Sequence, residues 1–428
     1  MRQLLRLDQK LDNELKHKLL LWSSSYQEVV WLDSNQIPHL HNRYQAILAV
    51  DSADTFAISG HGAFQGLSDW QQARSDWSFG YLGYDLKNDL EVLKSENKDI
   101  LEFPDLVFFR PKRLFLFTEE GVELYYLESI ASEMQSDWEA IQLMEIPEDQ
   151  AENRIKISVG TTPDQYREKV GKLLEHIRRG DIYEANFCME FYARNAEIDP
   201  ISTFNHLNRL SSAPFSTFFR YKDCFALSSS PERFLRKQGD RLISQPIKGT
   251  RKRGKDKQED QKLKLELEHD PKERSENIMI TDLVRNDMSK IARRGSVEVD
   301  ELCQVYSFEQ VHQMISTVSC SIKAEYDKVE VIKALFPMGS MTGAPKIRAM
   351  EIIEELEDFK RGLYSGTIGY FDPTGDFDFN VIIRTILYNQ AKHYLCLPVG
   401  SAITAGSNID QEYAECLLKA KAMREVLE

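Results

Sequence analysis

The chain has 428 residues, a formal net charge of -14 and 42% hydrophobic residues. That length and apolar content allow one large domain or two modest ones with a sizeable core. The acidic balance repels phosphate backbones at long range, so we expect no nucleic acid partner. No apolar run approaches the roughly 18 residues that a bilayer span needs, and the N-terminus lacks a secretory signal. These absences predict a cytoplasmic protein without membrane contact.

The N-terminal part, residues 1–118, reads as mixed strand and turn, with apolar runs at 46–50 and 106–109. Residues 128–157 are rich in Glu, Asp and Gln, which predicts a surface connection. We place a boundary near residue 150, which separates an N-terminal region (1–150) from a C-terminal region (151–428). The six cysteines are scattered without a C-x-x-C pair, so we expect buried free thiols.

Helix signals are clearest in the second region. Thr162, Pro163 and Gln165 form a capping pattern, and Gly180 supplies the stop. Asp270, Pro271 and Glu273 form the same capping pattern at the start of a second helix. We expect further helices at about 344–359 and 410–427, and strands at 187–192, 215–219, 225–228 and 241–245.

Two carboxylate pairs stand near predicted helix starts, Glu273 with Glu276 and Glu412 with Glu415. A spacing of three puts both members of a pair on one face of a helix. Acidic residues in a first turn can simply complement the helix dipole. Alternatively, the two helix starts converge on one hard cation such as Mg2+, which prefers oxygen ligands and is held by one or two carboxylates.

Glycine-rich turns recur at residues 338–346 and 365–370, where backbone N–H groups could approach an anionic ligand. Neither turn matches a dinucleotide or P-loop motif. Lys248 ends an apolar strand-like run, and the basic residues that follow it are interpreted as a solvated loop. A lysine that is partly desolvated beside a divalent cation has a lowered pKa, which would make its neutral amine a nucleophile.

Several motifs together resemble the chorismate-utilising enzymes, a family that includes anthranilate synthase component I, aminodeoxychorismate synthase component I, and the isochorismate and salicylate synthases. They occur in the family's order at 245–251 (QPIKGTR), 282–287 (DLVRND), 342–346 (TGAPK), 364–370 (YSGTIGY), 383–385 (IRT) and 412–415 (EYAE). The resemblance is dense from about residue 160 to 428. It implies an α+β fold in which two large antiparallel sheets pack face to face with helices outside.

The resemblance also implies roles for individual residues. Glu276 and Glu415 correspond to the Mg2+ ligands, with Glu273 and Glu412 close to the metal. Lys248, Glu232 and His312 correspond to the catalytic groups, with Glu232 as general acid. The implied contacts to chorismate are Gly249, Thr250, Thr342, Tyr364, Arg384 and the turn Gly400, Ser401 and Ala402.

Lys248 decides the branch, because aminodeoxychorismate synthases carry Lys where anthranilate synthases carry Ala. The resemblance therefore implies amination of chorismate at C4 for p-aminobenzoate and folate synthesis. No glutaminase motif is present, so ammonia would come from solution or a partner glutamine amidotransferase. The alternatives are anthranilate synthase component I and a non-catalytic chorismate-binding subunit.

Three positions depart from the family's pattern. Glu184 stands where water-using relatives have Lys and most amine-forming relatives have Gln, which disfavours water as the nucleophile. Ala402 ends a turn that is usually three glycines, and Gly406 replaces a usual Asp.

Overall fold

The computed structural model describes residues 1–37, 41–147, 154–308 and 311–428, and the boundary expected near residue 150 lies outside them. All strand pairs are antiparallel, and two arms of sheet meet at the long strands β3 (Ala46–Ile58) and β5 (Leu106–Thr118). β5 pairs with β4 through Leu106–Phe109 and with β6 through Arg113–Thr118. One half of β5 therefore belongs to each arm.

The first arm runs from β1 to β8, with two short strands on the outer edge of β8. In spatial order its members are β1 (Arg2–Leu7), β6 (Gly121–Leu127), β5, β3, β2 (Glu28–Asp33), β9 (Phe215–Tyr221), β10 (Cys224–Ser230), β19 (Thr385–Asn389), β20 (Tyr394–Thr404) and β8 (Glu184–Arg194), with β7 (Ser158–Val159) and β16 (Gly343–Ala344) at the edge.

The second arm starts at β5 and ends at β14. Its members are β4 (Ser78–Leu82), β17 (Thr367–Phe371), β18 (Phe377–Asn380), β11 (Arg233–Gln238), β12 (Arg241–Gln245), β15 (Val311–Ser321) and β14 (Glu298–Ser307), with β13 (Ile247–Lys252) also paired to β15. Strands from residues 1–147 pair with strands from residues 154–428 in both arms, through β2–β9 and β4–β17.

Alternation along the strands separates two cores. Val30, Phe219 and Leu387 point into the core between the arms, where the rings of Tyr81 and Phe219 meet edge to face at 5.1 Å. Their neighbours Trp31 and Phe218 point outward against helices. Because successive strand residues face opposite sides, one strand serves both cores. The predicted α+β fold, with two sheets packed face to face, is confirmed.

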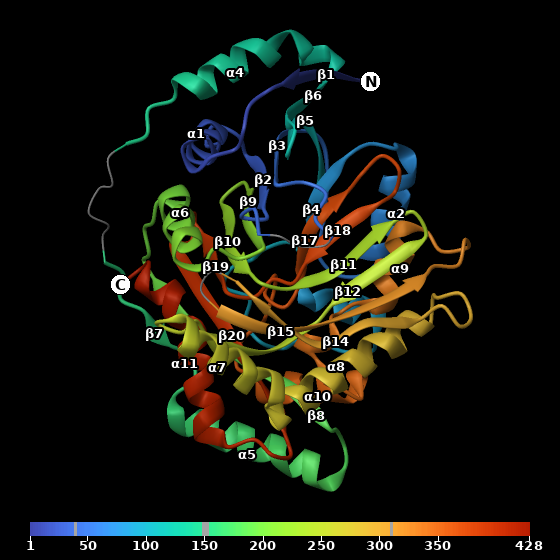
Figure 1. Cartoon of the computed structure of the whole chain (residues 1–428), viewed down its shortest axis with the longest axis vertical. Coiled ribbons are helices and arrows are strands. Elements are labelled where there is room, and N and C mark those ends of the chain that lie inside the picture. The colour runs from blue at the N-terminus through green and yellow to red at the C-terminus, as the bar shows by residue number, and fades with distance from the viewer. Residues whose placement is uncertain (38–40, 148–153, 309–310) are drawn as a thin grey trace.

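Helices cover the outer faces (Figure 1). The first arm is covered by α1 (Asn13–Ser23), α4 (Met134–Leu143), α5 (Pro163–Arg179), α6 (Pro200–Ser211), α10 (Lys346–Leu356) and α11 (Ile409–Glu425). The second arm carries α2 (Ala63–Ala73), α7 (Lys257–His269), α8 (Pro271–Ser289) and α9 (Lys328–Leu335). The remaining turns of helix are η1 (Tyr84–Leu86), α3 (Lys87–Leu90), η2 (Glu128–Glu133) and η3 (Gly339–Met341).

The capping signals were correct. Thr162 accepts a hydrogen bond from Gln165 N at the start of α5, Gly180 ends that helix in the left-handed region, and Asp270 caps α8. The four strands predicted in the second region are present as β8, β9, β10 and β12. The two later helices are present, with ends one to three residues from the expected positions.

Other expectations were wrong. The N-terminal part contains α1 and α2 as well as strands, and the surface connection contains η2 and α4, because Trp138 and Ile141 bury one face of α4. Helix α7 was not predicted, and its cap Asp256 accepts from Gln258 N and Glu259 N. Gly400, Ser401 and Ala402 lie inside β20 rather than in a turn, because their backbone pairs with β8.

All six cysteines are free and buried, as expected. Among the residues described, no helix combines the length and apolar character that a membrane crossing would require.

Candidate active site

Lys248 and Glu184 form a buried ion pair where the two arms approach each other. Lys248 lies on β13 of the second arm, and Glu184 is the first residue of β8 in the first arm. Lys248 Nζ donates to Glu184 Oε1 at 3.2 Å. The side chain of Glu184 is only 2% exposed. Its other oxygen, Oε2, is buried and has no hydrogen-bond partner among the described residues.

Carboxylates determine the charge of Lys248. Burial acts to lower its pKa, but the negative charges of Glu184, Glu276 and Glu232 outweigh burial and raise the pKa above the ordinary value. The lowered lysine pKa was expected for a site that holds a divalent cation, so it stays a prediction for that state. Lys248 is an ammonium at neutral pH and must lose a proton before it can act as a nucleophile.

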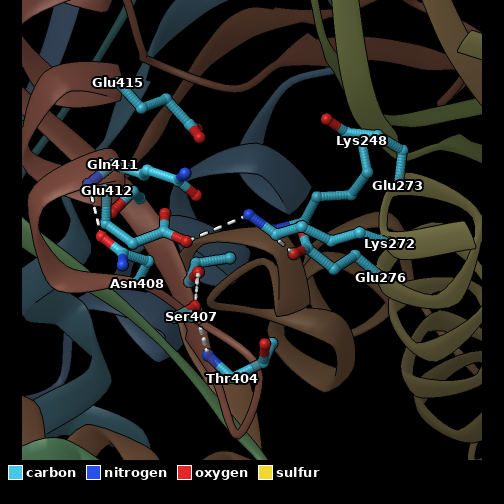
Figure 2. A network of polar contacts seen from close by, with 12 residues as sticks. Lys248, Lys272, Glu273, Glu276, Thr404, Ser407, Asn408, Gln411, Glu412 and Glu415 are labelled. Atoms are coloured by element: carbon cyan, nitrogen blue, oxygen red, sulfur yellow. Dashed lines mark hydrogen bonds and ion pairs between the residues drawn. The ribbon is translucent and has the colours of Figure 1, made fainter. Parts of the chain in front are cut away.

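The starts of α8 and α11 face each other across Lys272, as Figure 2 shows. Lys272 Nζ lies 3.0 Å from Glu412 Oε1 and 3.7 Å from Glu276 Oε1. Glu412 is fully buried, and Glu276 Oε1 is a buried atom with no hydrogen-bond partner among the described residues. Burial raises the pKa of Glu276 to about 7, against the effect of the nearby lysines. The convergence of the two helix starts is thus present, with an ammonium group between them.

The second carboxylate of each pair, Glu273 on α8 and Glu415 on α11, contacts a basic side chain other than Lys272. Glu273 Oε1 accepts from Arg251 Nη1 at 3.3 Å. Glu415 Oε1 lies 2.7 Å from Lys419 Nζ, and this lysine keeps the pKa of Glu415 low although burial alone would raise it. Within the described ranges, no group of three or more His, Cys, Asp or Glu side chains is already arranged to hold a metal ion.

Glu232 lines a small cavity on the second arm, together with Ser340 and Val381. Burial raises the pKa of its carboxyl to about 7, with Lys248 and Arg384 acting in the opposite direction. A carboxyl group with that pKa can hold a proton near neutral pH and release it during a reaction. Both Lys248 and Arg384 therefore lie close enough to Glu232 to affect its charge.

The residues expected to contact chorismate lie on several segments. Gly249 has a φ of 86°, and a Cβ there would come within 3.1 Å of Glu273 Oε2, so this position favours glycine. Thr250 follows it on β13. Thr342 is buried in the turn before α10, and Tyr364 is buried in the turn before β17.

Lys419 connects the Gly400–Ala402 segment to Glu415, because its Nζ donates to Gly400 O at 2.9 Å and lies 2.7 Å from Glu415 Oε1. Ser401 Oγ lies 3.1 Å from Tyr166 Oη. A Cβ at Gly400 would lie 2.6 Å from Cys188 Sγ, which explains the glycine. Ala402 pairs with Asn186, two residues from Glu184.

His312 is held away from this group. Its Nε2 lies 3.0 Å from Asp260 Oδ1 on α7, and its Nδ1 lies 2.9 Å from Ser307 Oγ on β14. Both ring nitrogens are therefore occupied by residues outside the carboxylate cluster. The structure brings together Lys248, Glu232 and the carboxylates of α8 and α11, but it does not bring His312 into contact with them.

Arg361 was missed by sequence reasoning, although all five of its N–H donors are used. Its guanidinium donates to Glu357 at 2.8 and 2.6 Å, to Met341 O at 2.7 Å, to Asn186 O at 2.8 Å and to Ser365 Oγ at 3.3 Å. Asn186 lies on β8, Met341 and Ser365 lie in the two glycine-rich turns, and Glu357 follows the last residue of α10. Arg361 thus fixes the segments that carry Glu184, Thr342 and Tyr364.

Sequence reasoning also gave no signal for a second cavity, which lies between the arms away from Lys248. Its lining includes Asp33, Asn42, Arg43, Phe215 and Tyr370.

The fold and site together define an enzyme-like two-sheet body with a buried lysine among carboxylates. The family model of chorismate binding enzymes matches residues 24–425. An anthranilate synthase component I-like protein of Synechocystis sp. is 35% identical over 353 residues, which is 82% of this chain and 72% of the relative. Aminodeoxychorismate synthase component 1 of Bacillus subtilis is 33% identical over 363 residues, 82% of this chain and 77% of the relative.

Among solved structures, anthranilate synthase component I from Streptococcus pneumoniae matches with a TM-score of 0.77 and 25% identity, over 91% of this chain and 93% of that one. The chain belongs to the chorismate binding enzyme family.

Proposed function

We propose that this protein is the chorismate-binding component of an aminodeoxychorismate synthase, which replaces the C4 hydroxyl of chorismate with an amino group. The observation that carries the proposal is Lys248, a buried lysine directed at Glu184 and close to Glu232 and Glu276. The name of the Bacillus subtilis relative supports it. Anthranilate formation, suggested by the names of other relatives, leaves this lysine without a task.

Lys248 is the proposed nucleophile. Attack of its amine on C2 of the ring would expel the C4 hydroxyl, and later attack of ammonia on C4 would displace the lysine. The amine must be neutral to attack, and the leaving hydroxyl needs a proton. Glu232, whose pKa burial raises to about 7, is the proposed donor of that proton.

Mg2+ is the proposed cofactor. Glu276 Oε1 is buried and accepts no hydrogen bond among the described residues, and Glu412 is buried at the opposing helix start. The two carboxylates fit a cation between them, and the ammonium of Lys272 now provides one. Glu276 and Glu415 would hold the metal, with Glu273 and Glu412 nearby. When bound, the metal would supply positive charge for a carboxylate of chorismate. Lys272 and Lys419 would then have to give up their carboxylate partners.

Ammonia for this reaction would come from solution or from a partner glutamine amidotransferase. The word component in the names of the relatives points to such an assembly. The product would be 4-amino-4-deoxychorismate, the precursor of p-aminobenzoate and folate.

The test is mass-resolved chromatography of the products from chorismate, MgCl2 and ammonium chloride at mildly alkaline pH. We expect 4-amino-4-deoxychorismate without pyruvate. Anthranilate with pyruvate would replace the proposal by anthranilate synthesis. Unchanged chorismate, both alone and with an amidotransferase of the same organism, would identify a binding subunit without turnover.

A further inference from the structure

The turn between α9 and α10 carries two hydroxyl groups, and the turn itself uses only one of them. Thr342 Oγ1 donates within the turn, at 3.1 Å from Met338 O and 3.2 Å from Gly339 O. Ser340 Oγ is buried and has no hydrogen-bond partner among the described residues. A buried hydroxyl without a partner loses the hydrogen bonds that water would give it. Ser340 therefore has a donor available for another group.

Glu232 and Ser340 line the same small cavity. Burial raises the pKa of the Glu232 carboxyl to about 7, and the Ser340 hydroxyl acts in the opposite direction. The turn holds Ser340 firmly beside α8, because a Cβ added at Gly339 would lie 2.8 Å from the Leu283 side chain. The free hydroxyl is thus fixed next to the carboxyl group that is the proposed acid.

We infer that Ser340 is a positioning residue for Glu232, and that its hydroxyl donates to the carboxylate which remains after Glu232 has given up its proton. This inference rests on the proposed function for the step in which the proton is used. In that step the O–H bond of Glu232 breaks, and the proton goes to the C4 hydroxyl as the bond between C4 and oxygen breaks and water leaves. The electron pair of the O–H bond stays on Glu232, where the donor of Ser340 stabilises it.

Most charged groups that face Glu232 have partners of their own. These groups are Lys248 on β13, Lys419 on α11, Arg384 before β19, Arg233 on β11 and Asp287 on α8. Four of them form ion pairs, Lys248 with Glu184, Lys419 with Glu415, Arg233 with Asp378 and Asp287 with Lys346. Arg384 is the group expected to bind a carboxylate of chorismate. Ser340 therefore offers Glu232 a donor that is not engaged elsewhere among the described residues.

Ser340→Ala tests the contact through the titration of Glu232. The titration is followed by infrared spectroscopy of protein with isotope-labelled glutamate, and the spectrum of the same protein with Glu232→Gln is subtracted. The subtraction is needed because burial also raises the pKa of Glu276 and of Glu190 to about 7. We expect the midpoint of Glu232 to rise by about one pH unit in Ser340→Ala, as for loss of one hydrogen bond to a charged group.

Turnover should report the same change when chorismate, MgCl2 and ammonium are saturating. The protonated form of Glu232 is the active one, so the decline of kcat with rising pH should move upward by the same amount. Below that decline kcat should fall severalfold, because a weaker acid gives up its proton less readily. The KM for chorismate should stay within about twofold, since Ser340 acts through Glu232.

Ser244→Ala is the matched control, because Ser244 lines the same cavity from β12 and is similarly buried. It should leave the midpoint of Glu232 unchanged. Ser340→Thr keeps a hydroxyl and should restore the parent midpoint. If Ser340→Ala does not fold, Ser340→Cys replaces the hydroxyl by a weaker donor of similar shape and should raise the midpoint by a smaller amount.

An unchanged midpoint in Ser340→Ala would overturn the inference. An equal rise in Ser244→Ala would overturn it as well, because it would indicate an effect of cavity polarity rather than of one hydroxyl. Failure of the parent protein to make the C4 amine is a different result, since it removes the proposed function. The infrared titration needs no substrate and decides the contact between Ser340 and Glu232 separately.

Discussion

Two buried ionic clusters differ in how completely their hydrogen bonds are satisfied. Around Arg361, every guanidinium N–H has an acceptor, and Glu357 also accepts from Cys188 N at 2.8 Å. Around Lys248, one oxygen each of Glu184 and Glu276 lacks a hydrogen bond among the described residues. The N–H groups of Arg361 and both carboxylate oxygens of Glu357 are satisfied without a ligand, whereas the carboxylates around Lys248 are not. This contrast separates a structural network from a site prepared for substrates.

Lys248→Ala should have the largest effect on the reaction, because it removes the proposed covalent route. We expect the rate of C4-amine formation to fall by about 10³-fold or more, while the variant keeps the fold of the parent protein. The measurement is product quantification from chorismate and ammonium, with far-ultraviolet circular dichroism as the control for folding. The same product at the parent rate would show that the lysine route is wrong.

Glu232→Gln should have the next largest effect. We expect kcat to fall by about 10²- to 10⁴-fold, as for loss of a general acid. The pKa of Glu232 is raised to about 7, so the proton-bearing form dominates below that pH and is lost above it. At saturating ammonium, the parent kcat should therefore decline as pH rises through 7. The variant should lack this decline, and a parent profile without it would argue for another acid.

Arg361→Ala tests the cluster around Arg361, and the measured quantity is the free energy of unfolding rather than the rate of turnover. Breaking a buried ion pair leaves Glu357 charged and unpaired, which costs about 3–5 kcal/mol in the free energy of unfolding. Urea denaturation measures the difference. Arg348→Ala is the control, because its ion pair with Glu351 is half exposed and its loss should change little. Equal effects of the two variants would contradict the contrast drawn between the clusters.

Lys272→Met should have the smallest effect, a severalfold tighter binding of a divalent cation. The substitution removes the ammonium that now lies between Glu412 and Glu276, so the metal no longer competes with it. Titration with Mn2+ followed by electron paramagnetic resonance reports the affinity without turnover. Lys262→Met, on the exposed face of α7, is the control. Weaker binding in Lys272→Met would show that the lysine assists the metal.

Local signals predicted part of the fold. The caps of α5 and α8 lie within four residues of the helices they start, so they can be read from short patterns. Helix α7 lacks a row of apolar residues along one face, since Leu267 is its only buried residue among those described. Helices α1, α2 and α4 have only 10 or 11 residues each. Their buried residues do recur at helical spacing, as Met134, Trp138 and Ile141 do in α4, so this local signal was missed.

The residues of the candidate site were chosen because ordered motifs resemble a family, not because spacing alone required them. The bridging position of Lys272 could not be foreseen, since it depends on how α8 and α11 approach each other. The same holds for the contact between Lys248 and Glu184, which are 64 positions apart and meet only when two sheets are in place. Arg361 carries no motif of its own that marks its role.

The pairing of early strands with late ones affects how the chain is made. β2 pairs with β9, which lies in the middle of the sequence, and β4 pairs with β17, which lies in its last third. During synthesis the N-terminal strands leave the ribosome long before their partners exist, so their edges stay bare and able to pair with other chains. Contacts of such long sequence separation also slow folding. Synthesis of this protein should therefore depend on chaperones that keep unpaired strand edges covered until the last third of the chain has emerged.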